Sequence, residues 1–227
     1  MVKPKLLLPF VIIGMLVLLG ALALNTPANA APLDNNTVLE PPVQQTEQYC
    51  LSCHSKPDLK RTLPSGEELS LYISPDHLAT SVHSAAGIEC EACHTDIKTY
   101  PHPAINYQTR RELSRSYYQA CQKCHSANYE KAQDSMHAKA AAEGNLKAAI
   151  CTDCHGAHDV QPPDQPRSKI SQTCSQCHQD IFNSYQESIH GAALINENNP
   201  DVPVCTDCHG VHNIQDPRTA QFRTRTP

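Results

Sequence analysis

The 227-residue sequence contains no tryptophan and only eleven phenylalanine or tyrosine residues, so large aromatic side chains are scarce. Apolar residues make up 40% of the chain, but residues 1–30 and the twelve cysteines supply much of that figure. Without them about 30% remain apolar, whereas a soluble domain ordinarily has about 45–50%. The chain therefore lacks an ordinary hydrophobic core, and either another group fills its interior or the chain is disordered.

An excess of positive charge is also missing. The 18 lysine and arginine residues are outnumbered by 23 aspartate and glutamate residues, which gives a net charge of −5 at pH 7. A nucleic-acid-binding protein would carry a basic face, so we expect no nucleic-acid partner. The local basic cluster of Arg110, Arg111 and Arg115 is interpreted as a solvated helix face.

The N-terminal residues have the pattern of an export leader. Lys3 and Lys5 precede an apolar run over residues 6–24, and Ala28-Asn29-Ala30 supplies the small residues of a cleavage site. This pattern predicts a signal peptide over residues 1–30. The run approaches the length of about 20 residues that spans a bilayer, so an uncleaved membrane anchor stays open. Either form predicts export, to the periplasm or the outer face of the cytoplasmic membrane.

All twelve cysteines fall into six Cys-x-x-Cys-His motifs, and no cysteine is left over. This motif attaches c-type haem. The two cysteines lie on one face of a helical turn and form thioethers with one haem, while the adjacent histidine binds the iron from the proximal side. The predicted thioether ligands are Cys50, Cys53, Cys90, Cys93, Cys121, Cys124, Cys151, Cys154, Cys174, Cys177, Cys205 and Cys208. The predicted proximal ligands are His54, His94, His125, His155, His178 and His209.

Paired cysteines have three other common roles, in zinc sites, disulfides and redox centres. The six pairs could form three Cys₄ zinc sites, or disulfides in an exported chain, but neither explains a histidine after every pair. A thioredoxin-like redox pair is expected once, near a βαβ pattern, and neither condition holds. We therefore predict six covalently bound haem c groups.

The six motifs alternate between two types. The first, third and fifth have glutamine two residues before the first cysteine, and the others closely follow an aliphatic residue. A Ser-aliphatic-His sequence separates the two motifs of each pair, and another histidine follows the second motif. Such repetition indicates three tandem two-haem modules. The six recurring histidines are the predicted distal ligands, and they are His83, His102, His137, His158, His190 and His212.

Spacing restricts how these distal histidines are used. His158 and His212 lie only three residues after a proximal histidine, so we expect each to reach a neighbouring haem. His77 has no counterpart in the other modules and is the spare histidine. Methionine ligation is not expected, because Met136 stands where the other modules have an aliphatic packing residue. Which distal histidine serves which iron does not follow from the sequence.

The expected fold is mostly α with little regular secondary structure, and the haems form its core. A small β-hairpin is predicted within residues 63–73 of the first module. Phe182, Tyr185 and Ile189 are spaced along one helix face, as are Tyr129, Ala132 and Met136. The predicted segments are the leader 1–30, a polar lead-in 31–47, modules 48–102, 103–158 and 174–212, a proline-rich linker 159–173 and a flexible tail 213–227.

The repeated Ser-x-His…Cys-x-x-Cys-His-Gly-x-His pattern over Gln48–His212 resembles that of class III-type (cytochrome c3/c7-like) multihaem c-type cytochromes. The resemblance implies closely packed, low-potential haems with two histidine ligands each, in an electron carrier rather than an enzyme. The implied partners are redox proteins, such as a quinol-oxidising membrane complex or a terminal reductase. The long first module and the missing glycine after His94 depart from the family pattern.

The leading functional hypothesis is a six-haem cytochrome that transfers electrons in an exported respiratory chain. A membrane-anchored cytochrome subunit of a quinol dehydrogenase is an alternative, favoured by an uncleaved leader. A second alternative is a catalytic multihaem reductase of a nitrogen or sulfur oxyanion, which needs an iron with an open distal position. Seven histidines outside the motifs for six irons argue against the reductase.

Overall fold

The computed structural model describes residues 47–104 and 106–223. All described residues belong to one compact unit. The predicted leader over residues 1–30 therefore lies outside the described residues. Within the described ranges, no helix is both long and apolar enough to span a membrane.

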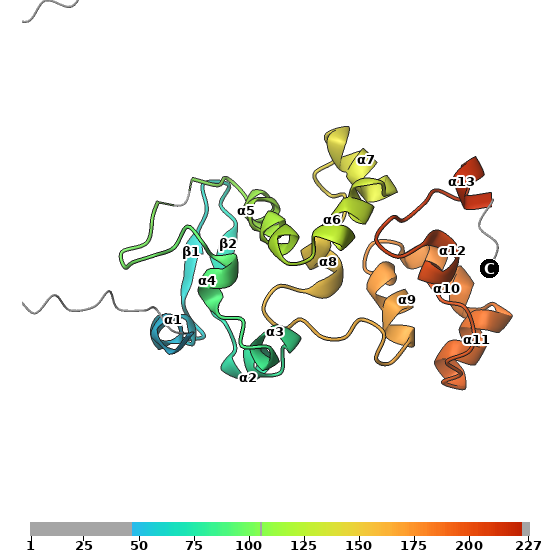
Figure 1. The fold of residues 1–227 in the computed structure, drawn as a ribbon, viewed down its shortest axis with the longest axis horizontal. Helices are drawn as coiled ribbons and strands as arrows, with labels where there is room; N and C mark the ends of the chain where they lie inside the picture. The colour runs from blue at the N-terminus through green and yellow to red at the C-terminus, as the bar shows by residue number, and fades with distance from the viewer. Residues whose placement is uncertain (1–46, 105, 224–227) are drawn as a thin grey trace, which may run out of the picture. The chain divides into compact units, whose positions relative to one another are not determined.

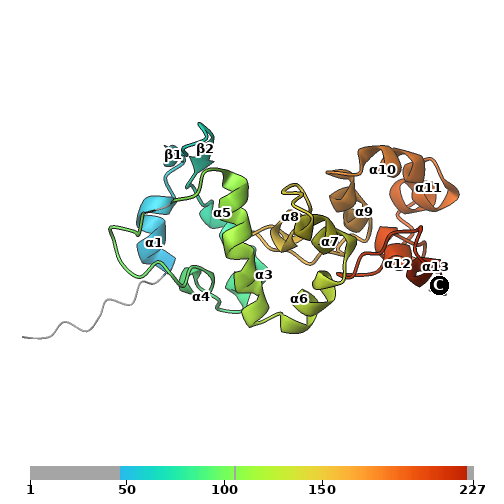
Figure 2. The same cartoon turned by 90° about the horizontal axis from the view of Figure 1, so that it is seen from above.

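Short helices joined by irregular segments make up most of the described chain (Figures 1 and 2). The elements are α1 Glu47–His54, β1 Lys60–Thr62, β2 Glu68–Ser70, α2 Pro75–Ala79, α3 Val82–Ala85, α4 Cys90–Cys93, α5 Arg110–Tyr117, the 3₁₀ helix η1 Tyr118–Lys123, α6 Ser126–Gln133, α7 Met136–Ala142, α8 Cys151–His155, α9 Ser168–Ser175, α10 Gln179–Gln186, α11 Ile189–Asn196, α12 Cys205–His209 and α13 Ala220–Arg223. The prediction of a mostly helical fold is confirmed.

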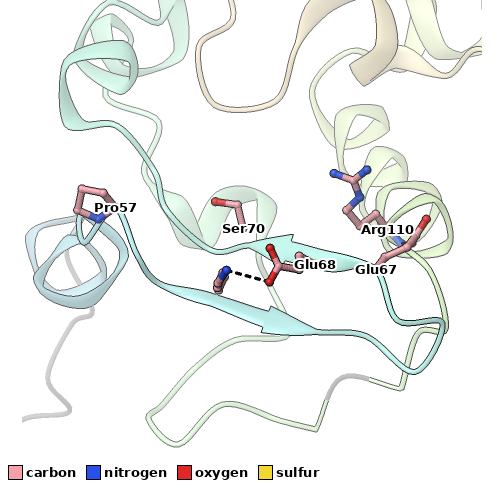
Figure 3. A pocket seen from close by; sticks show the side chains of 6 residues that line it. Pro57, Glu67, Glu68, Ser70 and Arg110 are labelled. Carbon is pink, nitrogen blue, oxygen red and sulfur yellow. Dashed lines mark hydrogen bonds and ion pairs between the residues drawn. The ribbon is translucent and has the colours of Figure 1, made fainter.

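The predicted hairpin is also confirmed, although its first strand, β1, ends just before the predicted residues 63–73. β1 and β2 are antiparallel, with Arg61 opposite Leu69. Figure 3 shows the pocket beside them, where Lys60 and Glu68 form a cross-strand ion pair of 2.8 Å. The Glu67 carboxylate accepts a hydrogen bond of 2.7 Å from the backbone N–H of Arg110. The hairpin thus holds the start of α5.

Three helices begin at the serine of the Ser-aliphatic-His sequences. Ser81, Ser135 and Ser188 are the N-caps of α3, α7 and α11, and each hydroxyl accepts a backbone N–H from the first turn. An N-cap residue has extended backbone angles, so the preceding helix has to end before it. The predicted continuous faces over residues 129–136 and 182–189 are therefore wrong, because each is divided between two helices.

Two other segments are more ordered than the sequence indicates. The predicted linker over residues 159–173 contains most of α9, which begins at Ser168 and carries Cys174 in its last turn. The predicted flexible tail begins at residue 213, yet the side chain of Gln215 is only 2% exposed. Both segments are held by polar contacts with other parts of the chain, which a scan for apolar periodicity does not detect.

Few apolar side chains are buried by the polypeptide itself. Among the described residues the buried apolar ones are Leu63, Ala148, Ile150, Leu194 and Val204. Large apolar side chains elsewhere are exposed, including Ile181 at 66% and Ile189 at 88%. The apolar deficit in the sequence therefore corresponds to a small polypeptide core, which cannot offset the conformational entropy lost on folding.

We predict that the full chain does not fold without covalent haem. Haem-free protein, produced where haem is not attached, should show no cooperative thermal transition by circular dichroism and poor dispersion in ¹H–¹⁵N spectra. The haem-loaded chain is the control and should show both features of a folded protein. A haem-free chain with a dispersed spectrum and a cooperative transition would contradict the prediction.

Candidate metal centre

Each Cys-x-x-Cys-His motif lies in or against a short helical segment. The motifs belong to α1, α4, η1, α8, α9 and α12. In all six, the first cysteine is partly buried and the second is exposed. Because i and i+3 side chains share one helix face, the motifs with both cysteines inside a helix, in α1, α4, α8 and α12, present two thiols to the same side, and the histidine follows directly.

Ten of the thirteen histidines form five pairs whose ring centres are 6.0–6.2 Å apart. Each pair joins one histidine of a motif to one predicted distal histidine. The pairs are His54–His102, His94–His158, His125–His83, His155–His212 and His178–His137.

The separation within these pairs fits two ligands of one metal ion. A histidine nitrogen binds a metal at about 2.0 Å and lies about 1.1 Å from its ring centre, so two opposite imidazoles have centres about 6.2 Å apart. Within the described ranges, no cluster of three or more histidine, cysteine or acidic side chains is placed to hold a metal. The pairs therefore fit the axial positions of haem iron, whose other ligands come from the porphyrin.

Four of the five pairs connect different predicted modules. His83 and His158 join the first module to the second, through His125 and His94. The second and third modules are joined by two equivalent pairs, His137 with His178 and His212 with His155. Only His54–His102 lies within one module. The histidines three residues after a motif thus lie beside another motif's histidine rather than their own.

Backbone carbonyls orient several of these rings. The Nδ1 atoms of His54, His102 and His209 lie 2.7, 3.1 and 3.0 Å from the carbonyl oxygens of Leu71, Thr99 and Gln215, respectively. An Nδ1–H that donates to a carbonyl leaves Nε2 with its lone pair, which is the arrangement of a metal-bound histidine. These three rings are therefore held in a ligand orientation by the polypeptide.

Burial also favours the ligand form of the imidazoles. It lowers the pKa of His94, His137, His155, His158 and His212 and is the largest cause in each case. A lower pKa keeps imidazole neutral at pH 7, and only neutral imidazole donates a lone pair to a metal.

Contacts between cysteines show that the motifs follow one another in space as in sequence. Within each module the first cysteines of the two motifs lie close enough to shift each other's pKa. Burial and then Cys50 raise the pKa of Cys90 to about 11, while interaction with Cys121 and Cys174 lowers the pKa values of Cys151 and Cys205 to about 7 and about 6, respectively. Between modules, burial and then charge on Cys121 raise the pKa of Cys93. Burial, charge on Asp153 and then charge on Cys177 raise that of Cys154.

In each of the last two modules, an ion pair connects the second motif to an arginine that precedes the first motif. Arg111 contacts Asp153 at 2.9 Å, and Arg167 contacts Asp207 in the equivalent place. Each aspartate also accepts the N–H of the aliphatic residue before its motif, at 2.7 Å. The interpretation of Arg111 as part of a solvated face is wrong, because its guanidinium also donates to the carbonyls of Leu146 and Ala148. The recurring Cys-Thr-Asp-Cys-His sequence was the available signal.

A second recurring contact joins consecutive modules at what we term the docking turns, residues 80–83 and 134–137. In the first, the Val82 N–H donates to the Val160 carbonyl at 2.9 Å, and Gln161 Nε2 donates to the Thr80 carbonyl at 2.8 Å. In the second, Met136 N–H donates to the Ile214 carbonyl at 2.8 Å. The signal missed in the sequence is the repeated His-x-aliphatic-Gln at residues 158–161 and 212–215.

Gln215 makes the equivalent side-chain contact at the second docking turn. Its Nε2 donates to the Asp134 carbonyl at 3.2 Å and to the Asn213 carbonyl at 2.9 Å. Its own carbonyl faces His209 Nδ1. One buried residue thus connects the docking turn to a motif histidine.

Three histidines remain outside the pairs. His77 lines a pocket with Tyr72 and His158. His190 is exposed, and no ring contact joins it to another histidine in the described part of the chain. The aromatic ring beside His209 is that of Phe222, with centres 5.0 Å apart. The ligand roles of His190 and His209 stay predictions, and His77 was expected to be the spare histidine.

We predict that Gln215→Ala lowers the free energy of unfolding of the haem-loaded chain by about 1–3 kcal/mol, because it leaves the Asp134 and Asn213 carbonyls without this donor. Chemical denaturation followed by circular dichroism measures the change. Gln133→Ala, at an exposed position in the last turn of α6, is the matched control and should change stability by less than about 0.5 kcal/mol. Equal effects of the two substitutions would show that the buried contact is unimportant.

Comparison with known proteins identifies one family. Residues 82–179 match the family model of cytochrome c3. No curated protein and no solved structure matches the chain. The matched stretch contains the second to fifth Cys-x-x-Cys-His motifs and three complete histidine pairs, those at His94, His125 and His178. This part of the chain is therefore similar to the cytochrome c3 family, and the likeness supports covalent binding of c-type haem.

Proposed function

We propose that this protein is a six-haem c-type cytochrome that carries electrons along a row of haems in an exported respiratory chain. The observation that carries the proposal is the set of five histidine pairs at 6.0–6.2 Å. Haem supplies the one-electron chemistry when it is bound, and the polypeptide supplies position, ligands and solvent exclusion. Two histidines at one iron occupy both axial positions, which suits electron transfer without substrate binding.

The contacts between motifs support a path through the sites in sequence order. Within modules, the first cysteines of the first and second, third and fourth, and fifth and sixth motifs lie close enough to shift each other's pKa. Between modules, cysteines of the second and third, and of the fourth and fifth, lie close enough to shift each other's pKa. A row of adjacent sites allows electrons to enter at one end and leave at the other.

The location and partners in this proposal rest on the N-terminal sequence. Lys3, Lys5, the apolar run and Ala28-Asn29-Ala30 support export. Cleavage after Ala30 gives a free carrier, and retention gives an anchored subunit that accepts electrons from a quinol-oxidising partner. Redox proteins, including a terminal reductase, are the proposed partners at the other end.

Intact mass of the exported protein tests haem number and leader processing together. We predict a polypeptide that begins at Ala31 and carries six covalent haems. A mass that retains residues 1–30 would favour the anchored quinol dehydrogenase subunit. Fewer than six haems on the fully matured protein would contradict the six-haem proposal. A protein without covalent haem would contradict the electron-transfer function as a whole.

One kind of cross-module pair uses the histidine of a Ser-aliphatic-His sequence, and the other uses the histidine that follows a second motif. Substitution tests the two kinds separately. His137→Ala and His158→Ala should each convert one haem to high spin, because each removes one ligand from the iron of His178 or His94. Electron paramagnetic resonance counts the high-spin centres, and the double variant should add two. His77→Ala is the control and should add none. An unchanged spin count in either single variant, with all haems attached, would show that the substituted histidine is not a required ligand.

A further inference from the structure

The histidine count leaves one motif without a partner. All thirteen histidines lie in the described residues, and ten of them form the five pairs. Of the three that remain, only His209 belongs to a Cys-x-x-Cys-His motif. Within this chain, then, five proximal histidines have an imidazole opposite them and the sixth has none.

The pairing rule explains why the missing partner belongs to His209. His94 and His155 are the motif histidines of the second motifs in modules one and two. Each pairs with the histidine that lies after the last motif of the following module, His94 with His158 and His155 with His212. By the same rule the partner of His209 would follow a further motif. No histidine of the 227 residues comes after His212.

The surroundings of His209 are those of a prepared ligand. Its Nδ1–H donates to the Gln215 carbonyl at 3.0 Å, as that of His54 donates to Leu71. The ring beside it is Phe222, with centres 5.0 Å apart and planes at 43°. A phenyl ring has no lone pair to donate to iron, and 5.0 Å is shorter than the 6.0–6.2 Å of the five histidine pairs. Phe222 therefore does not replace the missing imidazole.

We propose that the haem site of Cys205, Cys208 and His209 takes its distal ligand, an imidazole, from outside these 227 residues. This site thereby differs from the other five, and it is open to an external ligand in the isolated chain. The proposal rests on the proposed function, since it requires covalent haem at the sixth motif.

A third docking turn, residues 187–190, supports an external donor at this end of the row. It repeats the Ser-aliphatic-His sequence of the two turns that bind the following module. Its Ile189 is 88% exposed, against 40% for Val82 in the first turn. No backbone bond from Ile189 N–H to a carbonyl exists among the described residues, whereas Val82 and Met136 both donate. His190 is exposed on the same turn, so the surface that receives a neighbouring module is uncovered here.

Imidazole titration of the full-length, haem-loaded protein tests the proposal. Without imidazole, electron paramagnetic resonance should show one high-spin haem in six. Imidazole should convert that haem to low spin in a single step with a stoichiometry of one per chain, and carbon monoxide should bind one haem in six after reduction. His212→Ala is the matched variant, because it removes the partner of His155, and it should raise the high-spin count and the imidazole stoichiometry to two.

The remaining outcomes separate the sources of the ligand. High-spin signal that falls as protein concentration rises, together with a larger species in sedimentation, would assign the imidazole to a second copy of the chain and support the proposal. Six low-spin haems at all concentrations would overturn it, and a new high-spin haem in His190→Ala would then identify His190 as the internal ligand. Absence of covalent haem, seen by mass, would instead refute the proposed function.

Discussion

Pairing of histidines across module boundaries is the interaction on which the rest of this structure depends. Four pairs at 6.0–6.2 Å join residues that belong to consecutive modules, two pairs at each boundary. If the two histidines of such a pair hold one haem iron, as proposed, the haem would connect two consecutive modules. Because the described polypeptide buries few apolar side chains of its own, such connections would replace the hydrophobic contacts that hold ordinary domains together.

The polypeptide contributes mainly directional polar contacts. Serine N-caps fix where the helices that carry His83, His137 and His190 begin. Aspartates in the Cys-Thr-Asp-Cys-His motifs close the turn that presents the cysteines, and arginines connect them to α5 and to the start of α9. Such bonds specify geometry more than they add free energy, since each contributes only about 0.5–1.5 kcal/mol net. The arrangement suits a protein whose task is to hold cofactors at fixed separations.

Sequence reasoning predicted the parts of the structure that depend on local spacing. The six motifs, the recurring histidines and the hairpin near residues 63–73 follow from residues close together in the chain. The pairing of His94 with His158 does not, because it depends on how modules pack over a separation of 64 residues. The prediction of continuous helix faces is wrong for a local reason. Ser135 and Ser188 are N-caps that begin new helices, whereas the sequence pattern was assigned only to haem ligation. Arg111 and Gln215 were missed because their partners are distant carbonyls and carboxylates.

Anomalous diffraction at the iron absorption edge from crystals of the haem-loaded protein tests the cross-module pairing most directly. We predict an iron atom between the two rings of His94 and His158 and between the two rings of each of the other four pairs. An iron bound by two histidines of the same module at the second to fifth motifs would contradict it.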